Sequence, residues 1–179
     1  DSTLERLKTL SPIKIIVFPK NYGQTSALDA GIHAASGDVI ALLDGDLQND
    51  PRDIPAMLAK LDEGYDMVAG WRKSRQDTFG RRILSRCANW LTRKILEIEL
   101  HDYACALKVF RKKFISGIHL YGEMHVFLPA ILASRGARIT EMPVSHHARH
   151  TGLSKHSFMK AVKDVADLFT VKFLFSYAA

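Results

Sequence analysis

The strongest constraint on the fold is a run of five apolar residues that leads directly into two aspartates. Residues 39–43 read Val-Ile-Ala-Leu-Leu, and Asp44 and Asp46 follow one residue apart. A run of this length without polar alternation is typical of a strand buried on both faces of a parallel sheet. The two carboxylates would then lie at the carboxyl end of the strand, which is the edge where open α/β sheets bind ligands.

Two carboxylates this close repel each other, and burial increases that cost unless a cation lies between them. A divalent cation prefers oxygen ligands, and Gln48 offers a carbonyl oxygen in the same loop. The alternative is that Asp44 and Asp46 only cap the loop before the next helix. The apolar strand before them and Gln48 after them favour a metal site.

Strand and helix patterns alternate up to residue 70, which predicts a single α/β domain with a mostly parallel sheet covered on both faces. Predicted helices span 2–10, which a capping box begins, 25–35, and 51–64, with Ile54, Met57, Leu58 and Leu61 on one face; predicted strands span 13–18, 38–43 and 65–70. The strand at 38–43 is expected to be central in the sheet.

The second half of the chain breaks this alternation with a basic run over 72–94, in which Asp77 is the only acid. This run is either a solvated helix face or a surface for an anionic ligand or a membrane. Further predicted elements are a helix over 79–98, a strand over 104–110, a helix over 124–134, a strand over 137–144, a loop over 146–156 and a last helix from 157, with Phe158, Val162, Val165, Phe169 and Phe173 on one stripe. The stripe suits packing on the domain or contact with a membrane surface.

The overall charge narrows the class of partner. The formal net charge is +6 and the isoelectric point is near 9.4, so an anionic partner such as nucleic acid, a phospholipid or a phosphorylated substrate fits. Cys87 and Cys105 are too few for a zinc site or a disulfide framework and are expected to be reduced. The P-loop and dinucleotide-binding fingerprints are both absent. A metal-bound diphosphate leaving group remains as the chemistry that joins acids with basic loops.

Several motifs in order along the chain carry a resemblance to a known family. They are Asn21-x-Gly23-Gln24, Asp44-x-Asp46-x-Gln48 with Asp50-Pro51, Gly70-x-Arg72, and Arg149-x-x-Gly152-x-Ser154-Lys155. In this pattern the chain resembles the inverting GT-A glycosyltransferases of family 2, in the branch of dolichyl-phosphate mannosyltransferase and the undecaprenyl-phosphate sugar transferases. The resemblance implies a three-layer α/β/α GT-A fold and transfer of a hexose from a nucleotide sugar to a polyprenyl phosphate.

The resemblance also implies roles for individual residues. Asp44, Asp46 and Gln48 would hold Mg²⁺ or Mn²⁺ and, through it, the diphosphate of a UDP- or GDP-hexose. Asn21 and Asp44 would contribute to donor binding, and Arg149, Ser154 and Lys155 would lie on a loop that closes over the donor phosphates. Arg72, Arg81 and Ser85 would bind the acceptor phosphate. Asp102 and Glu123 are the candidate catalytic acids, and either could instead orient neighbouring basic groups.

The chain departs from the family pattern at both ends. Relatives begin with a strand that supplies an acid for the nucleotide, and this sequence starts after that point, so part of the nucleotide pocket is expected to be missing from residues 1–179. Relatives also often continue into membrane helices after the last amphipathic segment, here 157–179, so the resemblance implies a location at the cytoplasmic face of a membrane.

Three other functions remain open from the sequence alone. Transfer to a glycan hydroxyl would use the same fold but require a competent general base. A basic nucleic-acid-binding module is a second alternative, although the chain has no recognised binding motif and the acidic loop argues against it. The third is an inactive domain kept for interaction, and a homo-oligomer is compatible with each of these functions.

Overall fold

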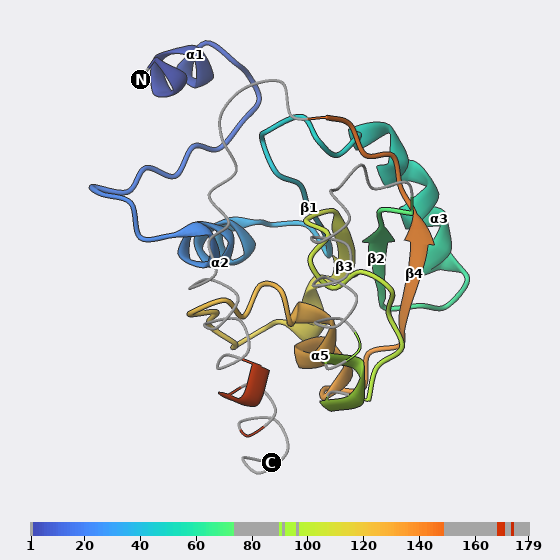
Figure 1. Ribbon diagram of the computed structural model, residues 1–179. Helices are drawn as coiled ribbons and strands as arrows, with labels where there is room; N and C mark the ends of the chain where they lie inside the picture. Colours follow the sequence, from blue (N-terminus) through green and yellow to red (C-terminus); the bar gives the residue numbers. More distant parts are fainter. Residues whose placement is uncertain are drawn as a thin grey trace.

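The computed structural model describes residues 2–73, 90, 92–95, 97–148, 168–170 and 173. Its elements are α1 (Thr3–Lys8), α2 (Gln24–Ala34), β1 (Val39–Leu42), η1 (Pro51–Asp53), α3 (Ile54–Asp62), β2 (Met67–Trp71), β3 (Lys108–Arg111), η2 (Lys112–Phe114), α5 (Leu128–Ala133) and β4 (Ile139–Pro143). Figure 1 shows α1 and the extended segment after it at the left of the molecule, and α3 and β4 at the right.

The four described strands form one mixed sheet in the order β1-β3-β2-β4. Strands β2 and β4 pair in parallel, and β3 lies antiparallel between β1 and β2. Three of the four strands therefore run in the same direction, which agrees with the expected mostly parallel sheet. The antiparallel β3 was not anticipated.

Helices cover both faces of this sheet, as predicted. On one face, Ile40 of β1 and Phe110 of β3 pack with buried residues of α2 and α5, such as Ile32 and Ile131. On the other face, side chains of α3 pack against β2 and β3 through Met57, Leu61, Val68 and Val109. Neighbouring residues of β2 and β3 enter opposite clusters because side chains alternate across a strand. The result is a three-layer α/β/α arrangement.

Two predictions about the strands are wrong. Residues 13–18 do not form a strand, and Ile13, Ile16 and Val17 are 47%, 44% and 62% exposed. β-Branched residues form a strand only where a neighbour supplies hydrogen bonds, and no described strand pairs with this segment. Strand β1 is also an edge strand among the described residues rather than a central one. Its burial alternates, with Ile40 and Leu42 buried and Ala41 exposed.

Other boundaries differ from prediction for local reasons. Helix α5 is shorter than 124–134 and starts beside Pro129, a residue that fits the first helical turn because it has no N–H to donate. Helix α1 forms after Ser2, but the Ser2 side chain makes no capping bond. On α3, Leu58 is exposed. Helix α3 is followed by Gly64 at φ 101°, the left-handed conformation expected where a helix stops.

Only a small part of the predicted C-terminal helix is described. Residues 168–170 and 173 are helical; Leu168 belongs to the core, whereas Phe169 and Phe173 are 57% and 66% exposed. Packing of the apolar stripe on the domain is therefore wrong at these two positions, because Leu168 makes that contact instead, and contact of the stripe with a membrane surface stays a prediction. Phe158, Val162 and Val165 lie outside the described residues. Of the helices in the described ranges, none has both the length and the apolar character needed to cross a membrane.

Candidate functional site

The strand register brings four separate chain segments to one edge of the sheet. Leu42, the last residue of β1, pairs with Lys108, the first residue of antiparallel β3. Lys108 also pairs with Ala69 of β2, and Trp71 at the end of β2 pairs with Pro143 of β4. The segments that leave β1, β2 and β4 therefore meet the segment that enters β3. They are residues 43–50, 72–73, 144–148 and 97–107.

The acidic loop after β1 is held at two points. The Gln24 side-chain amide, at the start of α2, donates to Oδ1 of Asp44 at 2.9 Å. Two residues further on, Oδ1 of Asp46 accepts the backbone N–H of Gln48 at 3.2 Å. Between them Leu47 adopts φ 60°, a strained conformation for an apolar residue. The loop is thus bent sharply, with both carboxylates at the sheet edge as the sequence predicts.

The electrostatics of this loop fit a bound cation. Burial raises the pKa of Asp44 above its usual 3.8, and the neighbouring Asp46 carboxylate raises it further. Lys108, the Gln24 amide and Arg72 act in the opposite direction and do not outweigh these effects. An ionised Asp44 therefore lacks sufficient compensating charge. Carboxylate oxygens and the Gln48 amide oxygen are the donors that Mg²⁺ and Mn²⁺ prefer, so the residues present suit the predicted metal.

Arg72 and Asp102, predicted to serve different roles, form one buried ion pair. Nε and Nη2 of Arg72 donate to the two carboxylate oxygens of Asp102 at 2.7 and 2.8 Å. The two side chains are only 12% and 7% exposed. This two-bond geometry fixes the plane of the guanidinium at the carboxyl end of β2. Sequence spacing did not reveal the pairing because thirty residues separate the partners.

Lys108 lies fully buried at the same edge and was missed by the sequence prediction. Its Nζ donates to the carbonyl oxygens of Tyr103, at 3.1 Å, and Cys105. Burial lowers the pKa of Lys108, and the charges of Asp102 and Asp44 partly counter this effect. The available signal was a single lysine within the apolar stretch 104–110. Lys108 therefore holds the turn that follows Asp102, and its positive charge lowers the pKa of Asp44 in the acidic loop.

The segment after β4 is tied to the acidic loop along its length. The backbone N–H of His147 donates to the carbonyl of Gln48 at 2.8 Å, and Asn49 and His146 form an isolated antiparallel bridge. The Gln48 side-chain amide also donates to the His147 carbonyl at 3.4 Å. Strand β4 therefore delivers the chain directly beside Asp46 and Gln48 just before residue 149.

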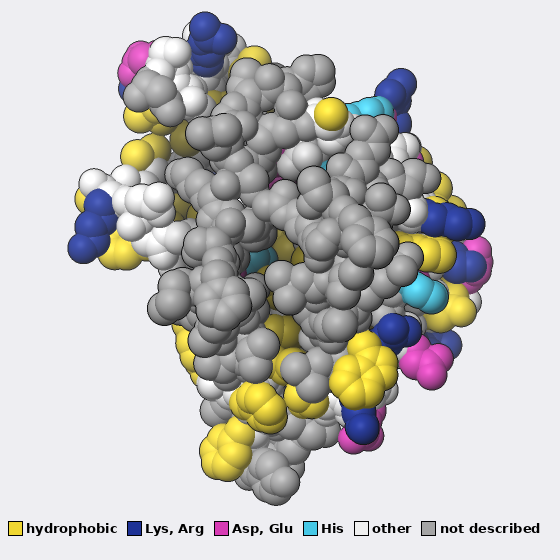
Figure 2. Space-filling view, viewed as in Figure 1, with side chains coloured by type: hydrophobic (Ala, Val, Ile, Leu, Met, Phe, Trp, Pro, Cys, Tyr) yellow, Lys and Arg dark blue, Asp and Glu magenta, His cyan; other side chains and the backbone are white. Residues whose placement is uncertain are grey.

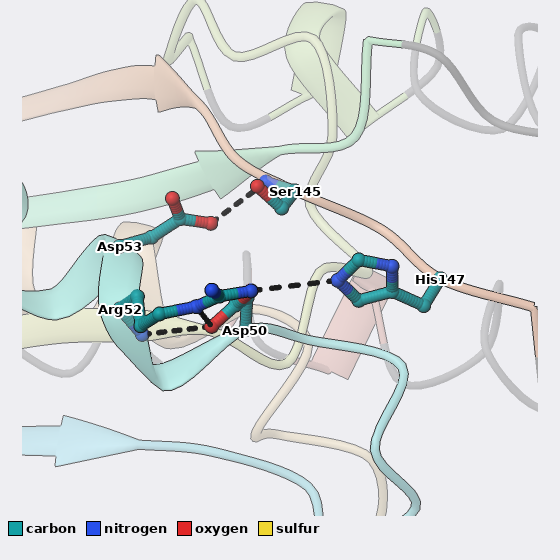
Figure 3. A network of polar contacts seen from close by, with 5 residues as sticks. All are labelled: Asp50, Arg52, Asp53, Ser145 and His147. Carbon is teal, nitrogen blue, oxygen red and sulfur yellow. Dashed lines mark hydrogen bonds and ion pairs between the residues drawn. The ribbon is translucent and has the colours of Figure 1, made fainter.

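A second set of contacts fixes the same two segments from the side of η1 (Figure 3). Asp53 accepts the backbone N–H of Ser145 at 2.7 Å, and Nε2 of His147 lies 3.5 Å from Oδ2 of Asp50. Arg52 donates from Nε and Nη2 to the Asp50 carboxylate and, with its backbone N–H, holds the pKa of Asp50 well below its usual range. Asp50 is therefore an ionised anchor at the start of η1.

Glu123 lies in a polar chain that reaches the start of α2. Its Oε2 is 3.9 Å from Nε2 of His125, whose Nδ1 is 2.7 Å from Oγ1 of Thr25. The Thr25 hydroxyl donates to the Gly122 carbonyl at 2.6 Å, so His125 Nδ1 must act as the donor toward Thr25. Thr25 follows Gln24, the residue that contacts Asp44. Glu123 is thus connected to the acidic loop through α2.

The remaining predicted site residues divide into two groups. Asn21 accepts the backbone N–H of Gly23 at 2.8 Å, in a turn that introduces α2. Gly23 has φ 92°, which explains the glycine at that position. The other group comprises Arg81, Ser85, Arg149, Ser154 and Lys155, all of which lie outside the described residues.

A hollow lined by Lys113, Phe114, Ser116 and Arg135 lies away from this edge. Residues of η2 form part of its lining, and η2 follows the end of β3. That end of β3 pairs with the beginning of β1, opposite to the end where the acidic loop lies. Arg135 is committed there to the carbonyl oxygens of Ser116 and Phe114. The hollow therefore does not belong to the acidic loop or to the ion pair.

Comparison with known proteins places this arrangement in context. Residues 1–118 match the sequence model of Glycosyl transferase family 2. The chain is 46% identical over 171 residues to dodecaprenyl-phosphate galacturonate synthase of Rhizobium johnstonii, covering 93% of this chain and 51% of that protein. It is 39% identical over 160 residues to undecaprenyl-phosphate 4-deoxy-4-formamido-L-arabinose transferase of an Enterobacter species, covering 89% and 49%. The chain thus spans about half the length of the curated relatives it matches.

Solved structures of glucosyl-3-phosphoglycerate synthase from Mycobacterium tuberculosis share the fold. The complex with Mn²⁺, uridine diphosphate and phosphoglyceric acid matches with a TM-score of 0.62 and 16% identity, covering 89% of this chain and 56% of that chain. The complex with Mg²⁺ and uridine diphosphate matches with a TM-score of 0.61 and 16% identity, covering 86% and 56%. At this level of identity the likeness establishes the fold alone. Together with the family match, it confirms the predicted GT-A fold class.

Proposed function

Because this chain belongs to glycosyl transferase family 2, we propose that it forms part of the catalytic domain of a metal-dependent inverting enzyme that transfers a hexose from a nucleotide sugar to a polyprenyl phosphate. Two relatives at 46% and 39% identity are named as sugar transferases or synthases acting with dodecaprenyl and undecaprenyl phosphate. The observation that carries the proposal is the placement of Asp44 and Asp46 in one loop at the carboxyl end of β1, where burial and the Asp46 carboxylate raise the pKa of Asp44.

On the donor side, Asp44, Asp46 and Gln48 would hold Mg²⁺ or Mn²⁺. The ion, when bound, would neutralise the diphosphate that leaves with the nucleotide. The Gln24 amide holds Asp44 in place, and the backbone pairing of Gln48 with His147 fixes the loop before a ligand arrives. The pairing also directs the chain toward Arg149, Ser154 and Lys155, which we propose contact the donor phosphates.

On the acceptor side, an oxygen of the polyprenyl phosphate attacks the anomeric carbon. The new carbon–oxygen bond forms as the bond to the diphosphate breaks, and the configuration inverts. A phosphate is already anionic near neutral pH, so no strong base is required. Asp102 accepts both Nε and Nη2 of Arg72. We therefore assign Asp102 the role of orienting Arg72 toward the acceptor phosphate. Arg81 and Ser85 would bind the same phosphate.

A membrane surface is the proposed location of the acceptor, at the cytoplasmic face. Figure 2 shows hydrophobic side chains along the lower edge of the molecule, where Figure 1 places the described part of the last helix. Phe169 and Phe173 are exposed there. Trp90 is also 57% exposed, with Nζ of Lys94 5.3 Å from its ring centre. Exposed aromatic rings beside lysine are typical of surfaces that contact lipid head groups.

The proposal is tested on the full-length protein by two measurements. Calorimetry with UDP- and GDP-hexoses, with and without Mn²⁺, should show metal-dependent donor binding. Asp44→Asn and Asp46→Asn should remove this binding, whereas Asp62→Asn, at an exposed position on α3, should retain it. Donor binding that is independent of Mn²⁺ and unaffected by Asp44→Asn and Asp46→Asn would refute the proposed metal site.

A transfer assay with polyprenyl phosphate then identifies the acceptor. Asp102→Asn should reduce but not abolish transfer, because the acceptor phosphate supplies its own negative charge. If the wild type transferred the sugar to a glycan hydroxyl and Asp102→Asn abolished that transfer completely, the alternative acceptor would be favoured. Binding of nucleic acid that weakens steeply with salt and is indifferent to Mn²⁺ would instead indicate a nucleic-acid-binding module.

A further inference from the structure

A group of potential metal ligands lies on α2, beyond the acidic loop. Asp29 and His33 are four residues apart on this helix, a spacing that places two side chains on the same face. His119 reaches the same place from the segment between η2 and α5, which passes beneath α2 in Figure 1. The three residues thus come from two segments that are ninety positions apart in the sequence.

Both imidazole rings converge on one carboxylate. Nδ1 of His33 lies 3.4 Å from Oδ1 of Asp29, and Nδ1 of His119 lies 3.2 Å from Oδ2. The two rings stack with centres 4.3 Å apart and an angle of 10° between their planes. Each of the three residues offers one ligand atom, and these atoms lie within 4.8 Å of one another.

From this geometry we propose that Asp29, His33 and His119 form a Zn²⁺ site. Two imidazole nitrogens and one carboxylate oxygen, with water in a fourth position, are a donor set that Zn²⁺ accepts in tetrahedral geometry. Mg²⁺ prefers oxygen donors alone. The proposed site therefore differs in metal preference from the loop of Asp44 and Asp46, and it does not depend on the proposed transferase activity.

The surrounding contacts prepare the ligands for this role. The backbone N–H of Leu120 donates to Oδ1 of Asp29 at 2.8 Å, which orients the carboxylate. Nδ1 of His33 also lies 2.9 Å from the Asp29 carbonyl oxygen, which keeps this ring beside the carboxylate. The His119 side chain is 76% exposed, so its ring can rotate toward the ion without repacking the core. A bound ion would join α2 to the segment before α5.

The test measures Zn²⁺ binding by calorimetry on the full-length protein with Mg²⁺ in large excess, so that the oxygen-only loop is occupied. We expect one Zn²⁺ equivalent to remain bound under these conditions. His33→Gln and His119→Gln should each raise its Kd by about tenfold or more. The matched control is His101→Gln, because His101 is an exposed histidine that pairs with a carboxylate, Glu141, and lies outside this group. It should leave the Kd unchanged.

Substitution of Co²⁺ for Zn²⁺ gives an independent readout of the ligands. Absorption of a four-coordinate Co²⁺ site without a thiolate charge-transfer band is expected, since no cysteine belongs to the group. Zn²⁺ binding that is unaffected by both His33→Gln and His119→Gln, or a thiolate band in the Co²⁺ spectrum, would overturn the proposal. Far-UV circular dichroism of each variant checks that it is folded.

Discussion

The ion pair between Arg72 and Asp102 gives the sharpest energetic prediction. The two partners exchange two charge-assisted hydrogen bonds of 2.7 and 2.8 Å and are 12% and 7% exposed. Removing one partner of a buried pair leaves the other charge uncompensated and costs about 3–5 kcal/mol. Asp102→Leu should fall at the upper end of this range, because Lys108 is a second buried basic group beside Arg72.

The double variant Arg72→Met/Asp102→Leu separates this penalty from ordinary packing loss. It removes both charges while keeping apolar side chains in their place, so it should be more stable than Asp102→Leu alone. Urea unfolding of the wild type, both single variants and the double variant yields the coupling free energy, expected at about 1.5 kcal/mol or more. Lys8→Met serves as the control, since Lys8 and its partner Glu5 have side chains 58% and 75% exposed and the loss of this ion pair should cost little.

A specific outcome would refute this reasoning. If Asp102→Leu lost less than about 1 kcal/mol, the pair would behave like an exposed salt bridge. If the losses of the two single variants simply added in the double variant, Arg72 and Asp102 would not depend on each other. In the transfer assay, an orienting role for Asp102 predicts that Asp102→Asn raises the KM for polyprenyl phosphate and leaves the affinity for the nucleotide sugar unchanged.

Three further predictions concern the same sheet edge. Asp44→Asn should stabilise the metal-free protein at neutral pH. Because the pKa of Asp44 is raised in the folded state, the wild type loses stability as pH rises from 3.8 through the folded-state pKa. Thermal unfolding should show the variant more stable than the wild type in EDTA and less stable in Mn²⁺. In the wild type the folded Lys108 loses its proton at a lower pH than the unfolded one, so stability rises with pH as the pH approaches 10.5. Lys108→Met should remove this rise, which urea unfolding across the pH range measures. Gly70→Ala should cost about 1–3 kcal/mol, as a Cβ would lie 2.9 Å from the Leu107 carbonyl oxygen, whereas Gly31→Ala, in open space on α2, should gain about 0.5–1 kcal/mol; thermal unfolding compares them.

Local pattern was sufficient to predict the architecture around the acidic loop. The apolar run before Asp44 identified a strand that ends at the ligand edge, and the periodicity of Met57 and Leu61 identified the buried face of α3. These predictions succeeded because a short apolar run is typical of a strand, and apolar residues at helical spacing indicate the buried face of a helix, so each needs only the sequence of one element. The placement of Asp44 and Asp46 followed directly from that.

Features that depend on partners distant in sequence could not be predicted. Residues 13–18 have the composition of a strand, but composition does not supply the neighbour with which a strand pairs. The antiparallel direction of β3 likewise cannot be read from the strand's own sequence. The burial of Lys108 and the pairing of Arg72 with Asp102 both follow from that direction, since it brings residues 102–108 to the edge where β2 ends.

The short bridge between Asn49 and His146 has a practical consequence for changing donor preference. Backbone hydrogen bonds join the acidic loop to the segment after β4. In a chimera that receives only one of these two segments from a relative, the two segments would not match at their hydrogen-bonded contact. Exchange of residues 44–50 and 144–148 together would preserve this contact, so a change in donor selectivity should be sought by replacing both segments at once.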